Sequence, residues 1–274
     1  MAHAALKAAY PIETSADEFT RLNIQADLFR KDARAMLAGL GGGAGLRVLD
    51  LCCGIGGTTD VLSEWVGEGG SVVGADLDTA KLDEACSWAA RQGLSNVTFV
   101  EADAFDTGFE PASFDLVHTR FALSVIENGL AMLDHILALT KPGGIVFLEE
   151  ADTRSMLCEP STADWVEARH IFRETFLAVG ADTSLGSRLD EECRARGMSD
   201  LQIRLCRHDQ TAADPMHFHV PLTLTAMRET IEERGLMKKT KLDALAARVT
   251  DHLASPGTKT TTFTMIQIAG RAPA

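Results

Sequence analysis

The stretch RVLDLCCGIGG, Arg47 to Gly57, runs from an apolar segment through an aspartate into two cysteines and three glycines. An apolar run that ends in a glycine turn is typical of a buried strand followed by a ligand-binding loop. Nucleotide-binding folds usually place a phosphate at such a turn, yet here a carboxylate, Asp50, lies at its mouth. A carboxylate repels a pyrophosphate and attracts an ammonium or a hydroxyl group, so Asp50 restricts the class of ligand.

Beyond the glycines, apolar strands alternate with helical segments of about 10 to 15 residues. The predicted strands are 47–51, 71–77, 96–103, 114–121, 143–151, 201–209 and 261–271. This alternation predicts an α/β fold with a doubly wound, seven-stranded sheet, mostly parallel with an antiparallel last strand. Ligands of such sheets bind beyond the carboxyl ends of the strands.

Helical segments are expected on both sides of this core. Ser15, with Glu18 three residues later, predicts a helix start, and the glycine-rich stretch 39–46 separates that helix from the first strand. We therefore expect a helical lid over residues 1–40 and a main domain over 41–274. Cap helices above the site are expected near 155–182 and 212–256, and helices that serve packing alone are the alternative.

Composition narrows the class of protein. The chain has 274 residues, a formal charge of −13 and 46% hydrophobic residues, which fits a globular protein with a sizeable core. It has no stretch dense in Lys and Arg, so we expect no nucleic-acid partner. It shows neither a signal-peptide pattern nor an apolar window of ~18 residues, so we expect a cytoplasmic protein that binds no membrane. A monomer and a homodimer both remain open.

A dinucleotide is a poor match to the glycine loop. Read from Gly54, the sequence is GIGGTT, which places Thr59 where the fingerprint G-x-G-x-x-G has its third glycine. Asp50 would also face the approaching pyrophosphate. An NAD-linked oxidoreductase is therefore the weaker alternative.

S-Adenosylmethionine, which has no phosphate, suits the acidic residues better. It carries an ammonium, a sulfonium, two ribose hydroxyls and an adenine amine. Asp50 can support the amino-acid end, and Asp76, at the end of the second strand, can accept hydrogen bonds from both hydroxyls. Asp103, after the third strand, can accept one from the adenine amine.

These motifs resemble those of the class I S-adenosylmethionine-dependent methyltransferases, in particular the bacterial branch that acts on small molecules of secondary metabolism. The motifs, in the family's order, are VLDLCCGIGG (48–57), VVGADLD (72–78), EADAFD (101–106), FDLVHTRF (114–121) and LTKPGGIVFLEE (139–150). The flanks EFTRLNIQADLF (18–29) and TMIQIAGRAP (264–273) resemble the family's lid helix and closing strand more loosely. The resemblance implies a Rossmann-like fold and S-adenosylmethionine as cofactor, with S-adenosylhomocysteine as product.

The resemblance also implies which residues bind the cofactor. These are Gln25, Asp50, Cys52, Gly54, Gly56, Asp76, Leu77, Asp103, Ala104 and His118. Leu77 would pack on the adenine, and Ala104 would meet its edge. The family usually has glycine where this chain has Cys52, so the backbone is less open to a ligand there.

Two residues at the end of the fourth strand are candidates for catalysis. His118 and Arg120 are two positions apart, so they point to the same side of the strand. We predict His118 as a general base and Arg120 as an electrostatic aid. The alternative is that one of them is structural and pairs with Glu149 or Glu150.

No metal site is predicted. Cys52 and Cys53 are adjacent and cannot easily share a tetrahedral ion without further ligands. His217 and His219 alternate along an extended segment, but they lack the oxygen-rich partners that a metal-dependent methyltransferase needs. The six scattered cysteines are expected to be reduced thiols.

The predicted function is methyl transfer to a small, largely apolar metabolite, with O-methylation slightly favoured over N- or C-methylation. The alternative of another class is an enzyme of the same fold that keeps the cofactor and catalyses a non-methylating reaction such as a cyclisation. The aromatic residues Trp165, Phe172 and Phe176 are expected to form the core face of a helix, and an aromatic substrate box is the alternative for them.

Overall fold

The computed structural model describes residues 10–12 and 14–274. Within them lies an eight-stranded sheet with the order β3-β2-β1-β4-β5-β8-β6, in which β7 also pairs with β8. The strands are β1 (Arg47–Leu51), β2 (Ser71–Asp76), β3 (Val97–Glu101), β4 (Phe114–Arg120), β5 (Thr140–Asp152), β6 (Leu157–Glu159), β7 (Ser199–Gln210) and β8 (Lys259–Arg271). Strands β1 to β5 pair in parallel, whereas β8 is antiparallel to β5, β6 and β7.

The predicted fold class is confirmed, and the sheet has one strand more than the seven expected. The additional strand, β6, is three residues long and pairs with the first residues of β8, from Lys259 to Thr261. So short a strand has no periodicity of its own, so the sequence pattern carries no signal for it.

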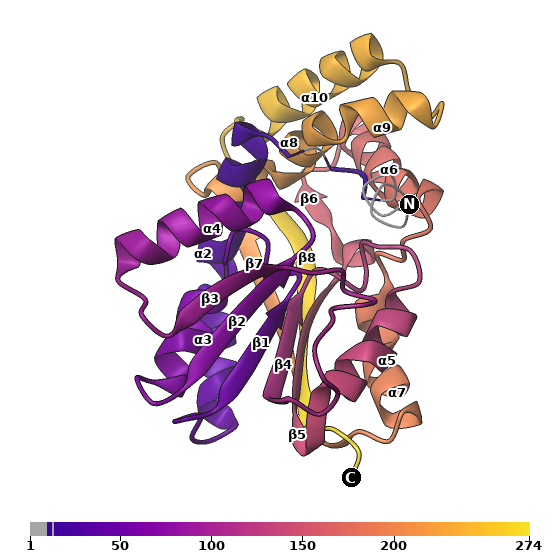
Figure 1. The fold of residues 1–274 in the computed structure, drawn as a ribbon. Helices are drawn as coiled ribbons and strands as arrows, with labels where there is room; N and C mark the ends of the chain where they lie inside the picture. The colour runs from indigo at the N-terminus through magenta and orange to yellow at the C-terminus, as the bar shows by residue number, and fades with distance from the viewer. Residues whose placement is uncertain (1–9, 13) are drawn as a thin grey trace.

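The helices cover both faces of the sheet and the edge beyond the carboxyl ends of its strands. They are α2 (Ala16–Gly39), α3 (Thr59–Val66), α4 (Thr79–Gln92), α5 (Gly129–Leu139), α6 (Ala163–Ala178), α7 (Leu189–Ala195), α8 (His219–Ala226), α9 (Arg228–Glu233) and α10 (Lys239–Leu253). Figure 1 shows α2, α3 and α4 along one face and α5 and α7 along the other. We call α6, α8, α9 and α10 the distal helices, because they lie beyond the carboxyl ends of β1 to β5 (Figure 1).

Alternating side chains of β1 serve the two faces of the sheet. Val48 packs in an apolar cluster with residues of α2 and α3, whereas Leu49 packs in a second cluster with residues of α5 and α7. Because successive strand residues point to opposite faces, a strand buried on both sides needs apolar residues at every position. That requirement explains why Val48 and Leu49, which are adjacent, are both apolar.

The distal helices have an apolar core of their own. Trp165 and Phe176 of α6, Leu224 of α8 and Leu245 of α10 are buried together in a third cluster. Phe263 of β8 belongs to the same cluster, so the distal helices are packed onto the sheet rather than hinged away from it.

The N-terminal helix begins where the sequence predicts. Ser15 is the N-cap of α2, and its hydroxyl accepts a hydrogen bond of 3.1 Å from the backbone N–H of Glu18. Ion pairs then join α2 to α3, with Arg34 2.7 Å from Glu64 and Arg30 2.9 Å from Asp60.

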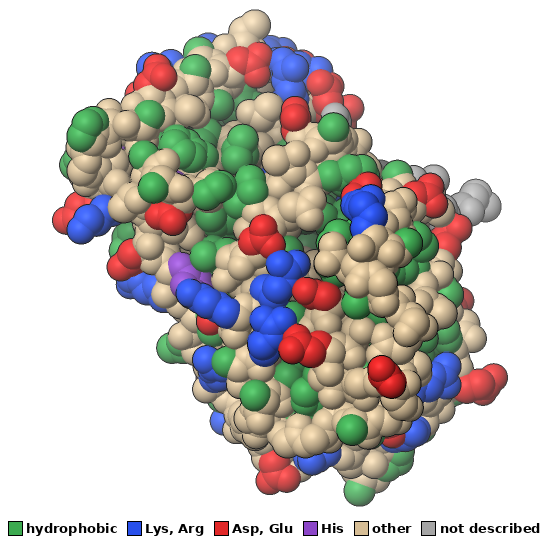
Figure 2. All heavy atoms as spheres, turned by 90° about the vertical axis from the view of Figure 1, so that its left-hand side faces the viewer, with side chains coloured by type: hydrophobic (Ala, Val, Ile, Leu, Met, Phe, Trp, Pro, Cys, Tyr) green, Lys and Arg blue, Asp and Glu red, His purple; other side chains and the backbone are tan. Residues whose placement is uncertain are grey.

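Charged side chains of both signs are interspersed over the face of the molecule shown in Figure 2, and hydrophobic side chains gather in its upper part. A shallow hollow is lined by residues of α2, of the segment around α8 and of α10, among them Ile24, Phe218 and Ala246. Within the described part of the chain, no helix is both long enough and apolar enough to cross a membrane.

Candidate active site

A cavity of about 860 Å³ lies between the carboxyl ends of the strands and the distal helices. Small-molecule sites span roughly 300–1,000 Å³, so this cavity has room for more than one small ligand. Its wall combines the loops after β1, β2 and β3 with residues of α2, α6, α8 and α9. The position agrees with the rule that such sheets bind ligands beyond their carboxyl ends.

Nine of the residues predicted to act in the site line this cavity: Gln25, Asp50, Cys52, Gly54, Asp76, Leu77, Asp103, Ala104 and Arg120. Gly56 and His118 are not among the described residues that line it. Gly56 has a φ of +81°, and a Cβ added there would point toward Phe99 and Trp88. Gly56 therefore shapes the turn rather than the ligand surface.

Asp76 ties two of the loops together. Its Oδ2 accepts a hydrogen bond of 2.8 Å from the backbone N–H of Gly54, and its Oδ1 accepts one of 2.9 Å from that of Asp78. Each carboxylate oxygen has a second lone-pair site, so Asp76 can still accept hydrogen bonds from a ligand. The loop after β1 and the end of β2 are thus held in one geometry at the cavity wall.

Cys52 has a φ of +58°, in the left-handed region that favours glycine. This conformation explains why glycine suits the position. Burial raises the pKa of the Cys52 thiol well above its usual value, and nearby Asp76 raises it further. The side chain is therefore a neutral thiol and not a reactive thiolate.

We expect Cys52→Gly to have a higher free energy of unfolding than Cys52→Ala, by about 1 kcal/mol. A side chain costs roughly 1–2 kcal/mol in the left-handed region, and alanine keeps that cost while glycine removes it. Chemical denaturation of both variants measures the difference. At Cys53, whose φ is not positive, the same pair should show the ordinary order, with alanine the more stable. Equal or reversed stabilities at position 52 would contradict this account.

His118 lies in the interior between two carboxylates. Its Nδ1 is 2.8 Å from Asp50 Oδ1, its Nε2 is 3.0 Å from Glu149 Oε2, and the imidazole is fully buried. Thr59 donates a hydrogen bond to the other Asp50 oxygen, and Gln267 donates one to the other Glu149 oxygen. These bonds form one continuous chain from Thr59 through Asp50, His118 and Glu149 to Gln267, and Asp50 also lines the cavity.

The charge state of His118 follows from this arrangement. Burial lowers its pKa, but Asp50 and Glu149 outweigh burial and raise the pKa to about 9. Both nitrogens of a charged imidazole are donors, so His118 has no nitrogen free to take a proton from a substrate. The geometry thus differs from the expected general base and matches the alternative in which this histidine pairs with Glu149.

Arg120, in contrast, reaches the cavity. Its side chain is 11% exposed, and its Nη1 is 4.0 Å from Glu149 Oε2. That Nη1 atom is buried and has no hydrogen-bond partner among the described residues. A Cβ added at Gly57 would lie 2.6 Å from Arg120 Nη2, so the missing side chain at Gly57 makes room for the guanidinium.

Glu150 fixes the loop after β4. Its carboxylate accepts hydrogen bonds from the backbone N–H groups of Ala122, Leu123 and Ser124, at 3.1, 2.9 and 3.2 Å. Burial raises its pKa to about 7. Ala122 and Ser124 line the cavity, so Glu150 positions this wall without lining it.

The sequence interpretation missed several polar residues of the wall. Arg21 of α2 makes a buried, bidentate ion pair with Glu18, at 2.6 and 2.7 Å, and Lys81 Nζ lies 4.8 Å from the ring centre of Tyr10. Arg21, Lys81 and Tyr10 all line the cavity. The spacing of Glu18 and Arg21 on a predicted amphipathic helix was a usable signal, because two charges three positions apart share one face.

The distal part of the wall is aromatic. Phe121, Phe172, Phe176 and Phe263 line it together with His219 and Thr223 of α8. Trp165 lies in the core of the distal helices. Phe172 and Phe176 pack in the core of the distal helices and also line the cavity. They therefore fit both interpretations left open for them, the core face of a helix and an aromatic substrate box.

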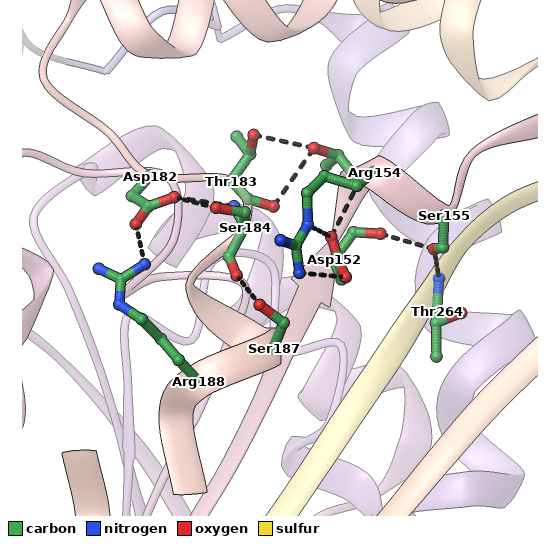
Figure 3. Close-up of polar contacts among 10 residues, drawn as sticks. Asp152, Arg154, Ser155, Asp182, Thr183, Ser184, Ser187, Arg188 and Thr264 are labelled. Atoms are coloured by element: carbon green, nitrogen blue, oxygen red, sulfur yellow. Dashed lines mark hydrogen bonds and ion pairs between the residues drawn. The ribbon is translucent and has the colours of Figure 1, made fainter. Parts of the chain in front are cut away.

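Polar contacts join the end of β5 to the segment after α6 and to β8 (Figure 3). Thr153, just after β5, donates through its backbone N–H and its hydroxyl to the Thr183 carbonyl, and its hydroxyl lies 2.8 Å from the Thr183 hydroxyl. The Ser155 hydroxyl donates to the Asp152 carbonyl and accepts from the backbone N–H of Thr264 on β8. The segment after α6 is thus fixed to the strand ends at the cavity, since Thr153 and Thr183 both line it.

His217 has partners that account for both of its nitrogens. Nδ1 is 2.8 Å from Thr260 Oγ1, and Nε2 is 3.0 Å from the Leu253 carbonyl. His217 is thus a buried structural residue, and it does not act together with His219.

Comparisons with known proteins agree with this geometry. Residues 48–144 match a family described as a methyltransferase domain. The demethylmenaquinone methyltransferase of Lactococcus lactis is 36% identical over 122 residues, which cover 44% of this chain and 47% of that protein. This chain spans about half the length of the curated relatives it matches.

Solved structures share the fold at low sequence identity. The YcgJ protein of Bacillus subtilis superposes with a TM-score of 0.59 at 18% identity, over 89% of this chain and 99% of that chain. The (4+2)-cyclase SpnF superposes with a TM-score of 0.53 at 20% identity, over 88% of this chain and 80% of that chain.

Proposed function

We propose that this chain is a class I S-adenosylmethionine-dependent methyltransferase, as its domain match over residues 48–144 supports, and that it transfers a methyl group to a small, largely apolar metabolite. The observation that carries the proposal is the set of three carboxylates, Asp50 in β1, Asp76 at the end of β2 and Asp103 just after β3, which line one cavity. Asp76 and Asp103 oppose a pyrophosphate and suit a nucleoside with hydroxyl and amine donors, whereas the charge of Asp50 is balanced by His118.

The residues present fit that cofactor. Asp76 would accept hydrogen bonds from the ribose hydroxyls, Asp103 would meet the adenine, and Leu77 would pack beside it. The unpartnered Nη1 of Arg120 would bind the carboxylate of the methionine end, because guanidinium and carboxylate form strong charge-assisted hydrogen bonds. Bound there, S-adenosylmethionine supplies an activated methyl group on a sulfur that becomes a neutral thioether.

The acceptor would occupy the aromatic part of the cavity. Phe121, Phe172, Phe176 and Phe263 form a wall that favours an apolar molecule with a flat ring. The relatives named demethylmenaquinone methyltransferases support an apolar cyclic acceptor. We propose oxygen as the accepting atom, with α2 acting as a lid and the distal helices as a cap. Residues 1–9 and 13 of the expected lid lie outside the described residues.

Calorimetry and mass spectrometry test the proposal together. We expect S-adenosylhomocysteine to bind with one molecule per chain, and NAD⁺ to give no heat of binding. Incubation with S-adenosylmethionine carrying a deuterated methyl group and a panel of phenols, amines and quinols should then yield a labelled methyl ether. Absence of S-adenosylhomocysteine binding would contradict the cofactor assignment. Binding without any methylated product would favour a non-methylating reaction such as a cyclisation.

A further inference from the structure

Two polar residues interrupt the aromatic wall of the cavity. His219 is the first residue of α8, and Thr223 follows one helical turn later, so the two lie on the same face of the helix. Both line the cavity and are almost fully buried, at 4% and 1% exposure.

Each of the two residues has one buried polar atom that lacks a partner. His219 Nδ1 and Thr223 Oγ1 are buried without a hydrogen-bond partner among residues 10–12 and 14–274. Buried polar groups in native proteins are nearly always paired. Two unpaired groups on one turn of a helix, at the wall of a cavity, therefore indicate that a bound molecule supplies the partner.

The surroundings of His219 indicate the shape of that molecule. The imidazole lies 5.6 Å from the ring of Phe263, in a T-shaped arrangement, and 6.0 Å from the ring of Phe172. Phe121 in turn meets Phe263 edge to face at 5.3 Å. Aromatic rings prefer these offset and edge-on contacts, so an aromatic ligand would continue the cluster.

The charge state of His219 indicates the ligand's polar group. Burial lowers its pKa well below the usual value, and the positive charge of Arg21 lowers it further. The imidazole is therefore neutral, and in the tautomer with its proton on Nε2 the Nδ1 atom is a hydrogen-bond acceptor. An acceptor in an aromatic wall selects a ligand that donates, such as a hydroxyl group.

We propose that His219 and Thr223 form the subsite for the methyl acceptor, and that this acceptor is an aromatic molecule whose hydroxyl group donates a hydrogen bond to Nδ1 of His219. The proposal rests on the proposed function and assigns its substrate class and its proton acceptor. In the transfer, the hydroxyl oxygen bonds to the methyl carbon, the methyl–sulfur bond breaks with its electron pair remaining on sulfur, and the hydroxyl proton passes to Nδ1. Thr223 Oγ1 hydrogen-bonds the same ligand and sets its orientation.

Equilibrium binding of two matched probes tests the subsite without turnover. The probes are 2-naphthol and naphthalene, which share a ring system and differ in one hydroxyl group, and the protein is saturated with S-adenosylhomocysteine. We expect the wild type to bind 2-naphthol roughly tenfold more tightly than naphthalene, as one well-made hydrogen bond allows. His219→Phe, which keeps an aromatic ring, should abolish this preference, and Thr223→Val should reduce it to roughly threefold.

The controls separate the subsite from the cofactor site. Both variants should bind S-adenosylhomocysteine within twofold of the wild type, which also shows that they are folded. His170→Phe, the same change at a histidine 66% exposed on α6, should keep the wild-type preference. If His219→Phe retains the preference, or if the wild-type complex binds neither probe, the subsite is overturned while the proposed function stands. If the wild type does not bind S-adenosylhomocysteine, both are overturned.

Discussion

Asp76→Ala is expected to weaken the binding of S-adenosylhomocysteine by at least about 100-fold. The carboxylate accepts hydrogen bonds from Gly54 and Asp78, so its removal leaves two backbone N–H groups without their acceptor. The proposed hydrogen bonds to the ribose hydroxyls are lost at the same time. Bonds to a charged group are worth about 1.5–3 kcal/mol each, and about 1.4 kcal/mol is a factor of ten in affinity, so the loss of two predicts this size.

Isothermal titration calorimetry on folded protein measures the effect. Asp134→Ala is the matched control, because Asp134 is a 62% exposed carboxylate paired with Arg196, outside the cavity lining. It should leave the affinity within twofold of the wild type. An unchanged affinity in Asp76→Ala would show that the loop after β2 does not bind the nucleoside.

The sheet could be predicted because its signals are local. Strands such as β1 and β2 are buried on both faces, and their adjacent apolar residues precede Asp50 and Asp76. Once the strands are parallel, their carboxyl ends must meet at one edge. The cavity-lining positions of Asp50, Asp76 and Asp103 follow from this topology alone.

The spacing of His118 and Arg120 could not predict that His118 is buried in the sheet while Arg120 lines the cavity. His118 is paired across the sheet with Asp50 on one side and Phe147 on the other, so neighbouring strands enclose it. The pairing of β4 with β1 stops at His118, and Arg120 extends beyond it to the cavity. Alternation along a strand gives the side to which a residue points, but not how far its neighbours extend.

The sequence could not predict which aromatic residues come together in the wall of the cavity. It brings together Phe121 after β4, Phe172 of α6, His219 of α8 and Phe263 of β8, which lie far apart in the sequence. Contacts of this kind depend on how the distal helices pack, and helical periodicity identifies a buried face without identifying what it meets. The unpaired atoms of His219 and Thr223 are visible only when that packing is known.

Substitution of His118, which the sheet encloses, should strongly lower the free energy of unfolding. We expect His118→Leu to lower the free energy of unfolding by about 3–5 kcal/mol, because it leaves the buried carboxylates of Asp50 and Glu149 without their shared cation. Chemical denaturation at pH 7 measures this. His170→Leu, at an exposed histidine, should change the value by less than about 0.5 kcal/mol.

The pH dependence of unfolding distinguishes a charged His118 from a neutral one. Its pKa is about 9 in the folded protein and about 6.5 in an unfolded chain. The stabilisation is therefore complete below pH 6.5 and is lost as the pH rises through 9. Between pH 7 and 8.5 the folded state holds close to one more proton, so the wild type should lose about 1–2 kcal/mol.

Between pH 7 and 8.5 the change in the free energy of unfolding comes mainly from His118. The raised pKa of Glu150, about 7, lowers the free energy of unfolding mainly below pH 7. The raised pKa values of Cys52 and Cys53 lower it mainly above pH 8.5. The free energy of unfolding of His118→Leu should accordingly be nearly constant between pH 7 and 8.5, whereas that of His170→Leu should fall as in the wild type.

If the free energy of unfolding of the wild type does not change in this range, His118 is neutral in the folded protein. One of its nitrogens would then be an acceptor that faces a carboxylate. Such a contact would repel rather than bind, so the 2.8 and 3.0 Å distances to Asp50 and Glu149 require the proton that the slope reports.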